Sequence, residues 1–442
     1  MQKSEELKRM VELKAPRGTE DTLPQQWALW RRLEKVSREV FELFGYQEIR
    51  TPIFEDTRLF VRGIGEATDI VEKEMYTFAD SASGGEDSPG GSGPAAITLR
   101  PENTAGVMRA YVEYELYKTQ KFQKFYYVGP QFRKERPQAG RLRQFHQIGI
   151  EAVGSQDPLL DVETISVATQ VYDRLGLTGH EVKLNTIGCE KCRPPYRKNL
   201  KEALLQYKKN LCQLCLSRLD RNVFRVLDCK QEQCKEVSHK MPTVYDYLCQ
   251  ECKEHFQTVK EALVSVDIRY DLDPFLVRGL DYYTKTVYEI VHPSLGARNA
   301  ICAGGRYDNL ISEIGGPPIG AVGFAMGVES GLLALTNVLK GGASLLNEGI
   351  HPPAVYLISI GQEARRECFK LAQRLRGHGL SCDLDYEGRS PKAQMRMANK
   401  LGAKKVIVIG PEELEKGLLK LKDMETGQEN LVKEEDVLKL KA

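Results

Sequence analysis

Five arginine and lysine side chains lie close together in Phe125–Glu151, FYYVGPQFRKERPQAGRLRQFHQIGIE, between apolar flanks. The aromatic run Phe125–Val128 is typical of a strand, Gly129 and Pro130 break it, and strand-like alternation resumes at Phe145. The pattern predicts a hairpin that presents Arg133, Glu135, Arg141 and Arg143 around one loop. Arginine forks bind phosphate oxygens bidentately and stay charged when desolvated, so the hairpin suits phosphoryl or nucleotidyl chemistry. A solvated basic hairpin on a surface sheet is the alternative.

Eight of the eleven cysteines fall in one stretch, residues 188–263. Two C-x2-C pairs separated by nineteen residues have the spacing of a tetrathiolate zinc site: Cys189, Cys192, Cys212 and Cys215. The remaining four form a second candidate set: Cys229, Cys234, Cys249 and Cys252. Two closed tetrathiolate sites would stabilise a small helical module that has little core of its own. Free thiols are the alternative.

Length, charge and hydropathy limit the class of protein. A chain of 442 residues is too long for one ordinary domain, so we expect two or three. Because the formal net charge is only +2, a nucleic-acid partner would have to contact local basic clusters. The first fourteen residues lack an apolar core, and no window approaches about 18 consecutive apolar residues. The sequence therefore predicts a cytoplasmic protein that does not enter a membrane, with thiol or metal-bound cysteines.

Local patterns predict the elements that position these groups. An apolar stripe at helical spacing predicts a long amphipathic helix over Trp27–Phe44, and Tyr46–Thr51 is typical of a strand. The glycine- and serine-rich segment 80–96 predicts a mobile loop without chemistry. A helix is expected from RPENT at 100–104 to about Leu116.

The last ninety or so residues alternate strand and helix patterns. Strands are expected at 355–360, 381–386 and 405–409, and helices at 363–376 and 391–401. This alternation predicts a small α/β domain with helices on a largely parallel sheet.

Four segments, occurring in order, resemble the bacterial type of histidyl-tRNA synthetase. They are RTPIFEDTRLF at 50–60, LRPENTA at 99–105 with the arginine hairpin, LVRGLDYYTKTVYE at 276–289, and AGGRYDNLI with GAVGFAMGVES at 303–330. The first, second and last are similar to the three motifs of class II aminoacyl-tRNA synthetases. RGLDYYT and GGRYD are similar to the two segments that set the histidyl enzymes apart. The resemblance extends from Ala15 to the C-terminus.

The resemblance implies an α+β catalytic domain, in which helices flank an antiparallel sheet, followed by an α/β anticodon-binding domain. The expected parts are an N-terminal extension (1–14), the class II catalytic domain (15–187 and 264–338), a cysteine-rich helical insertion (188–263), a linker (339–352) and the anticodon-binding domain (353–442). It also implies a homodimer whose interface contains the helix that begins at Trp27 and the RTPIFE strand.

The implied activity is that of an ATP-dependent ligase. Histidine is activated with ATP to histidyl-adenylate and pyrophosphate, and is then transferred to the 3′ end of tRNA(His), with Mg²⁺ on the β- and γ-phosphates. The crowded, anionic transition state of the first step needs fixed cations. Arg133 would contact the reacting carboxylate and the α-phosphate, with Arg278 on the opposite side, where related synthetases use a metal. Glu135 would orient the adenine or its hairpin partner, or form a structural ion pair, and completes the implied ATP-binding set with both arginines.

A histidine pocket must pair both imidazole nitrogens and the α-ammonium, because unpaired buried polar groups are what reject analogues. The resemblance assigns substrate binding to Glu102, Asn103, Thr104, Arg133, Gln147, Glu151, Arg278, Tyr282 and Tyr283. We expect the carboxylates and Gln147 to divide the ammonium and ring contacts. Core packing is the alternative for Tyr282, and Glu151 lies in an otherwise apolar strand, IGIEAVG.

One position departs from the family pattern. After Glu329 the family carries an arginine that binds the γ-phosphate, and this chain has Ser330. The change predicts either weaker ATP binding, by roughly 2 kcal/mol or more, or a substitute cation. The lysines of the insertion suit contact with the acceptor arm of tRNA, and Arg389, Lys392 and Lys400 suit the anticodon, although a solvated helix face is the alternative for the insertion.

Two rival functions follow from the same resemblance. A catalytically silent paralogue, such as the regulatory subunit of ATP phosphoribosyltransferase, shares the catalytic fold but senses histidine, and Ser330 is compatible with it. The intact LVRGLDYYT segment and the C-terminal domain favour the enzyme. A synthetase for threonine, proline or glycine would share the C-terminal domain, but RGLDYYT and the strand of Glu151 favour histidine.

Overall fold

The computed structural model describes residues 13–66, 68–79, 96–138, 140–296, 299–339 and 352–440. The chain divides into two compact units, Met1–Leu346 and Asn347–Ala442. The expected loop at 80–96 falls outside the described residues apart from Ala96, as does nearly all of the expected extension and linker. Among the described residues, no helix combines the length and the apolar character needed to cross a bilayer.

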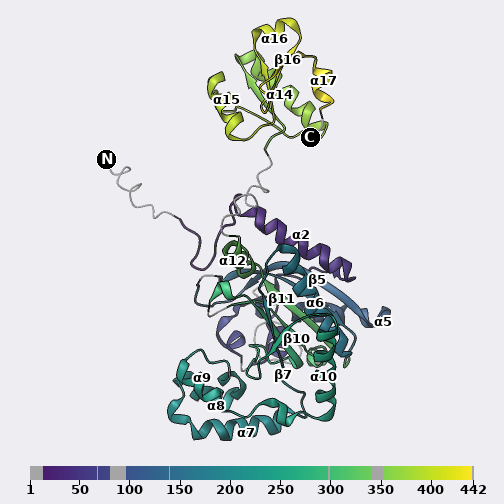
Figure 1. Cartoon of the computed structure of the whole chain (residues 1–442), viewed down its shortest axis with the longest axis vertical. Helices are drawn as coiled ribbons and strands as arrows, with labels where there is room; N and C mark the ends of the chain where they lie inside the picture. Colours follow the sequence, from purple (N-terminus) through teal and green to yellow (C-terminus); the bar gives the residue numbers. More distant parts are fainter. Residues whose placement is uncertain are drawn as a thin grey trace, which may run out of the picture. The chain divides into compact units, whose positions relative to one another are not determined.

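An eight-stranded sheet forms the centre of the first unit, with strand order β1-β5-β6-β11-β10-β9-β7-β8 (Figure 1). Its strands are β1 Gln47–Glu48, β5 Gln123–Phe132, β6 Gln144–Val153, β7 Glu181–Thr186, β8 Tyr270–Leu272, β9 Thr284–Val291, β10 Ala300–Arg306 and β11 Ala321–Gly327. The six strands from β5 to β7 pair antiparallel, and the edge strands β1 and β8 pair parallel with their neighbours. The sheet is therefore antiparallel except at its edges.

Helices cover both faces of this sheet. On one face, α2 (Trp27–Leu43), α6 (Pro158–Leu175), α12 (Val328–Val338) and part of α10 (Gln250–Ser265) contribute to the main apolar core. On the other face, α4 (Thr104–Glu113) and α11 (Leu310–Glu313) pack over a smaller core that contains Tyr283 and Tyr307. Arg306 is fully buried beside the first core, where it forms an ion pair with Asp161 of α6 at 2.5 Å. Its role is structural.

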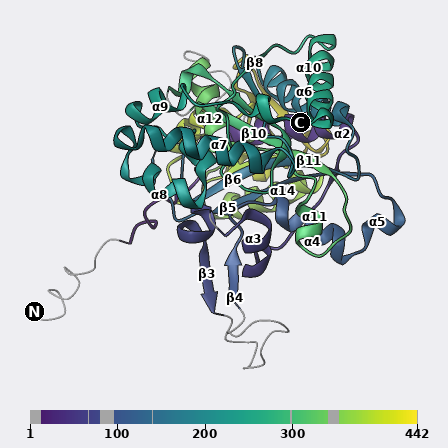
Figure 2. The same cartoon turned by 90° about the horizontal axis from the view of Figure 1, so that it is seen from below.

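A second, three-stranded sheet has the order β2-β4-β3, with β2 Phe54–Asp56, β3 Tyr76–Ala79 and β4 Ala96–Leu99. It lies beside α3 (Thr57–Ile64), and β3 and β4 extend away from the rest of the unit (Figure 2). Phe54 and Phe78 are 58% and 51% exposed, so this sheet presents apolar side chains to solvent.

The cysteine-rich segment forms its own small core from α7 (Arg193–Gln206), α8 (Gln213–Arg221), α9 (Glu232–Ser238) and the start of α10. Helix α10 joins two cores, since Cys252 packs in the insertion and Val259 packs with α6 in the catalytic core. In both views α10 lies beside α6 (Figures 1 and 2).

The second unit is an α/β domain with the strand order β13-β12-β14-β15-β16. Its elements are β12 Val355–Ser359, α14 Gln362–Gly377, β13 Cys382–Leu384, α15 Pro391–Lys400, β14 Lys405–Ile409, α16 Pro411–Lys416, β15 Leu419–Asp423, β16 Glu429–Val432 and α17 Glu434–Leu438. Val355 and Leu357 face α14, whereas Tyr356 and Ile358 face α15, so helices cover both faces. The three predicted strands are parallel, but β15 and β16 add an antiparallel hairpin that the sequence pattern did not indicate.

Two predictions about strands were wrong. The predicted break at Gly129–Pro130 does not occur, because β5 continues through both residues and pairs Pro130 with His146. β1 is only two residues long and pairs with β5 at Phe125 and Tyr126, so β5 is an edge strand at Pro130 and the missing N–H of proline is tolerated. The predicted strand Tyr46–Thr51 is reduced to this same short β1.

Candidate active site

Four adjacent strands build the floor of a cavity of about 100 Å³. Side chains alternate along a strand, so Ile148 and Ile150 of β6 face the main core while Gln147, Gly149 and Glu151 face the opposite side. The pairing register places Tyr127, Ala325 and Ala303 in one row with Gly149, and Gly323 in one row with Glu151. Ala303 and Ala325 line the cavity and leave space that a ligand side chain can fill, whereas the space over Gly149 and Gly323 is taken by Tyr127, Glu151 and Tyr307.

Glu151 lies beside the small cavity without lining it and is 1% exposed. Its carboxylate accepts a hydrogen bond from Thr104 Oγ1 at 2.7 Å and another from the Tyr307 hydroxyl. Burial raises the pKa of Glu151 well above its usual value, the bond from Thr104 opposes the rise, and the nearby Glu102 carboxylate adds to it. Glu151 is thus a buried acid whose charged form needs a cationic partner.

Glu102 caps the start of α4. Its carboxylate accepts hydrogen bonds from the backbone N–H groups of Thr104 at 2.6 Å and Ala105 at 3.0 Å. Burial raises the pKa of Glu102, and these two N–H groups limit the rise. The cap holds Glu102 and Thr104 in fixed positions on the wall of the cavity, which both residues line.

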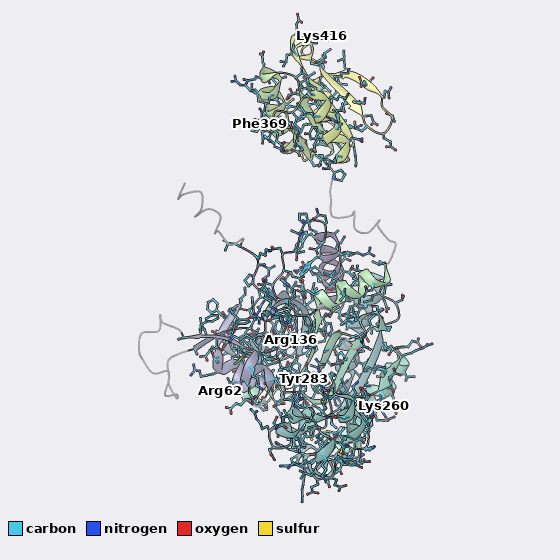
Figure 3. All side chains as sticks on the ribbon, turned by 90° about the vertical axis from the view of Figure 1, so that its left-hand side faces the viewer. Arg62, Arg136, Lys260, Tyr283, Phe369 and Lys416 are labelled. Carbon is cyan, nitrogen blue, oxygen red and sulfur yellow. The ribbon has the colours of Figure 1, made fainter. Side chains whose placement is uncertain are left out.

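Tyr282, Tyr283 and Tyr307 form the aromatic wall of the cavity (Figure 3, which labels Tyr283). The rings of Tyr282 and Tyr307 meet edge to face, with centroids 5.3 Å apart. All three side chains are at most 5% exposed. Tyr282 and Tyr283, the predicted pair, therefore pack against their neighbours and can also contact a ligand in the cavity.

A second cavity, of about 540 Å³, adjoins the first. Among the described residues, only Arg133, Arg278 and Leu280 line both cavities. Arg133 follows β5 and donates from Nε to the backbone oxygen of Pro101 at 2.9 Å, which fixes its guanidinium. The two predicted catalytic arginines therefore lie where a group in the small cavity would meet a group in the large one.

Arg278 is held by an ion pair with Glu289 of β9. Burial is the largest single effect and opposes its charge, but Glu289 together with Tyr283, Asp228 and Tyr282 raises the pKa of Arg278 above its usual value. Its buried Nε has no hydrogen-bond partner among the described residues. A charged, partly unsatisfied donor of this kind is suited to an anionic ligand.

The large cavity also contains the remaining hairpin groups. Glu135 accepts from Arg141 Nη1 at 2.9 Å and lies 3.8 Å from Arg133 Nη1, so the predicted ion pair forms in this structure. Ser330, at the start of α12, lines the same cavity and donates to the Gly140 carbonyl oxygen at 3.3 Å. Arg218, Arg225 and Lys230 of the insertion line its other side.

A pair of carboxylates in the large cavity fits a hydrated divalent cation. Glu74 and Glu135 both line the cavity beside Arg133. Burial raises the pKa of Glu74, and the negative charge of Glu135 raises it further. Two carboxylates that repel each other beside Arg133 form an oxygen donor set that suits Mg²⁺.

Seven of the nine predicted histidine-binding residues line the small cavity, and Glu151 is bonded to two lining residues, Thr104 and Tyr307. Asn103 does not line it: its Oδ1 accepts from Thr51 Oγ1 at 2.5 Å and from Arg100 Nη1 at 3.1 Å. These bonds tie the start of α4 to Thr51 and Arg100. The buried Nδ2 of Asn103 has no hydrogen-bond partner among the described residues.

Sequence reasoning missed Tyr127 and Tyr307, both of which line the small cavity. Tyr307 follows GGR in a motif that the analysis did single out, and Tyr127 lies in the aromatic run of β5. The signal for Tyr127 is the glycine opposite it, since a Cβ at Gly149 would lie only 2.4 Å from the Tyr127 ring. That pairing is known only once the strand register is known.

The structure groups the eight cysteines differently from the prediction. One cluster contains Cys189, Cys192, Cys249 and Cys252, and the other contains Cys212, Cys215, Cys229 and Cys234. The predicted sets, which followed sequence order, are therefore wrong as sets, although all eight residues take part. The reason is that α10 folds back beside the start of α7, so the last C-x2-C pair meets the first.

Family models match nearly the whole chain. The model described as histidyl-tRNA synthetase matches residues 18–330, and an anticodon-binding domain model matches residues 354–440. A histidine–tRNA ligase of Halothermothrix orenii is 48% identical over 419 residues, which cover 95% of this chain and 96% of that protein. One from Caldicellulosiruptor bescii is 45% identical and covers 97% and 98%.

Solved structures agree with these matches. The apo histidyl-tRNA synthetase of Staphylococcus aureus has a TM-score of 0.76 at 34% identity and covers 96% of this chain and 98% of that one. A Bacillus halodurans protein described as an ATP phosphoribosyltransferase regulatory subunit or histidyl-tRNA synthetase has a TM-score of 0.62 at 23% identity, covering 91% and 99%, a likeness in fold alone.

Proposed function

The chain belongs to the histidyl-tRNA synthetase family, and from this premise we propose how its side chains divide the reaction. Its activity is that of an ATP-dependent ligase, which activates histidine to histidyl-adenylate and transfers it to the 3′ end of tRNA(His). The anticodon-binding domain follows the catalytic domain, as the sequence predicted. The silent histidine-sensing alternative is not supported, because full-length relatives at 45–48% identity are histidine–tRNA ligases.

We place the histidine side chain in the small cavity and ATP in the large one. The observation that carries this assignment is the position of Arg133 and Arg278, which line both cavities. The carboxylate of histidine and the α-phosphate would meet between these guanidinium groups, which neutralise charge on both reactants as the carboxylate oxygen attacks and pyrophosphate leaves. Glu135 and Arg141 then orient the ATP side of the same junction.

We assign recognition of histidine to the polar groups of the small cavity. Glu102 supplies a carboxylate, Gln147 a buried amide oxygen without a partner among the described residues, and Tyr282 and Tyr283 the aromatic wall. Glu151 is the second proposed carboxylate: it does not itself line the cavity but is bonded to Thr104 and Tyr307 of the lining. Thr104 positions Glu151 through its hydrogen bond. An amino acid without matching donors would leave these buried acceptors unpaired, which costs binding energy.

Mg²⁺ is the proposed metal of the ATP site, with Glu74 and Glu135 as the carboxylates that would hold it. When bound, it would neutralise the β- and γ-phosphates. We further propose that the insertion cysteines bind structural zinc.

We propose that the protein is a homodimer. The support is the exposed apolar surface of the β2-β4-β3 sheet, including Phe54 and Phe78. Phe54 itself lies in RTPIFE, the segment that resembles the family's dimer element. We propose the domain boundaries of the sequence analysis and a cytoplasmic location, where thiols stay reduced. Mass measurement by light scattering during gel filtration tests the dimer: a monomer would contradict it.

The activity assignment is tested by histidine-dependent exchange of pyrophosphate into ATP, run beside the other amino acids. We expect exchange with histidine alone, and a loss of roughly 10²–10³ in kcat for Arg278→Ala. Because Glu289 would lose its partner in that variant, Arg278→Lys is the matched control, and it should recover part of the rate but not the bidentate contact. Histidine binding without exchange would contradict the assignment.

A further inference from the structure

The two thiol clusters of the insertion have the dimensions of zinc sites. In each cluster the four sulfur atoms lie within 4.8 Å of one another. The Sγ–Sγ separations are 3.6 Å for Cys189 and Cys192, 3.9 Å for Cys189 and Cys249, and 3.8 Å for Cys212 and Cys229. A tetrahedron with Zn–S bonds of about 2.3 Å has edges of about 3.8 Å. A disulfide would need about 2.05 Å, so the spacing fits a shared ion and not paired sulfurs.

Backbone groups support both clusters. The N–H of Cys249 donates to Cys192 Sγ at 3.2 Å, and the N–H of Cys212 donates to Cys234 Sγ at 3.2 Å. In each case the donor belongs to a residue whose own thiol lies in the same cluster. N–H bonds to sulfur orient thiolate ligands and partly offset their negative charge. The two clusters thus repeat one arrangement.

The clusters occupy different places along the chain. The outer cluster, Cys189, Cys192, Cys249 and Cys252, joins the point where the chain leaves β7 to the start of α10. The inner cluster, Cys212, Cys215, Cys229 and Cys234, lies wholly between these points. The outer cluster therefore closes the base of the insertion, and the inner one orders its end.

The base of the insertion is bonded directly to the segment that carries the active-site side chains. Lys285 N donates to Gly188 O at 2.8 Å, and Ile187 N donates to Lys285 O at 2.8 Å. The Lys285 ammonium lies 3.0 Å from Glu251, which sits between Cys249 and Cys252. Lys285 has a φ of 50°, a left-handed conformation that its surroundings must hold.

A small cavity marks the same junction on its other side. Arg193, next to Cys192, lines a cavity of about 60 Å³ together with Arg278 and Asp281. The outer cluster is thus connected to the Arg278–Lys285 segment through Gly188, Glu251 and Arg193.

We infer that the insertion binds two zinc ions in nested tetrathiolate sites, and that the outer ion positions the Arg278–Lys285 segment for adenylation. The second part rests on the proposed function of Arg278, whereas the first does not. Cys189 and its cluster are positioning residues, because they touch neither substrate.

The zinc content of cysteine variants tests which cysteines share a site. Purified protein should contain two zinc ions per chain by inductively coupled plasma mass spectrometry. Cys189→Ser/Cys249→Ser removes two thiols from one site and should keep one ion, whereas Cys189→Ser/Cys212→Ser removes one from each and should keep none. Pairing in sequence order predicts the opposite result for these two variants. Cys368→Ala/Cys382→Ala, in the C-terminal unit, is the control and should keep both ions.

The unaltered protein gives a second measurement that does not depend on variants that fold. Zinc K-edge absorption should show four sulfur neighbours at about 2.3 Å. The inference would be overturned if the purified protein contained no zinc, or if the ion had nitrogen or oxygen neighbours.

The positioning role is tested by comparing the sites. Cys249→Ser/Cys252→Ser should lower the kcat of histidine-dependent exchange by about tenfold or more per active site, with active sites counted by stoichiometric adenylate formation. Cys215→Ser/Cys234→Ser alters the two inner-cluster thiols that do not line the large cavity, and should leave this normalised kcat within about twofold at saturating ATP, even if it lowers the melting temperature. Equal effects from both pairs would overturn the positioning role. Failure of the unaltered protein to exchange would instead overturn the proposed function and leave the zinc sites standing.

Discussion

Glu151 combines complete burial with a carboxyl group whose pKa is raised by that burial. The free protein therefore holds the protonated acid at pH values where the unfolded chain, with a pKa of about 4.3, is ionised. Native protein then binds more protons than unfolded protein, so stability falls as pH rises from the unfolded to the folded pKa. Binding of the histidine ammonium would reverse this by favouring the carboxylate.

We accordingly predict that Glu151→Gln stabilises the free protein while weakening substrate binding. Thermal unfolding should show a gain over the unaltered protein at pH 8 that shrinks towards pH 5. The KM for histidine should rise by about tenfold to hundredfold, since a charged hydrogen bond is lost. Glu363→Gln, at an exposed position on α14, is the control and should change neither quantity. A variant less stable than the parent at pH 8 would contradict the assignment.

Ser330 occupies the place of the family's γ-phosphate arginine, and it lines the large cavity. Its hydroxyl donates only to Gly140 O, so it supplies no charge to a ligand. Ser330→Arg should lower the KM for ATP by about tenfold or more in the exchange assay, because one charged hydrogen bond contributes about 1.5–3 kcal/mol. Ser330→Ala should change it little. An unchanged KM in Ser330→Arg would indicate that other cations, such as Arg141 or Lys230, already fill this role.

Among the elements, the strands β5, β6, β11 and β10 determine the size of the small cavity. One face of these strands holds the apolar core, and the other alternates functional side chains with glycine and alanine. The small residues are required because neighbouring strands bring large side chains over them. Gly323 is the clearest case, since a Cβ there would lie 2.5 Å from both Glu151 Oε2 and the Tyr307 hydroxyl.

We predict that Gly323→Ala displaces these two groups and removes most histidine-dependent exchange, with KM affected at least as strongly as kcat. Gly331→Ala, in α12, is the matched control because a Cβ there meets only Leu33 at 3.9 Å. Steady-state exchange measured at varied histidine concentrations gives KM and kcat for both variants and distinguishes them. Normal KM in Gly323→Ala would show that the floor of the cavity is not where histidine binds.

The whole molecule consists of two units, of which only the first contains the thiol clusters. Removal of zinc with a chelator should therefore lower the melting temperature of the catalytic unit and leave that of the anticodon-binding unit unchanged. A loss of several kcal/mol corresponds to roughly 5 °C or more for a unit of this size. Differential scanning calorimetry with and without chelator measures this, and the transition that shifts with histidine and ATP identifies the catalytic unit. The variant Cys189→Ser/Cys212→Ser, treated in the same way, should show no further shift.

The sequence by itself determined the family, the ligase activity and the α+β and α/β classes of the two domains. The family, the activity and the α+β class follow from four segments that resemble the family's motifs, and the α/β class of the C-terminal domain follows also from local periodicity, which encodes local conformation. They were confirmed by family models and relatives that extend along nearly the whole chain.

Only the tertiary structure decided which of these residues meet. Strand register brought Tyr127 over Gly149, and the packing of α10 brought Cys249 and Cys252 to Cys189 and Cys192. Because β1 is short, Pro130 lies at an edge of the sheet, where the missing N–H of proline is tolerated. β5 therefore continues through a residue that was expected to end it. Each is a contact between segments far apart in the chain, and its energy depends on the faces that pack together and not on the local sequence.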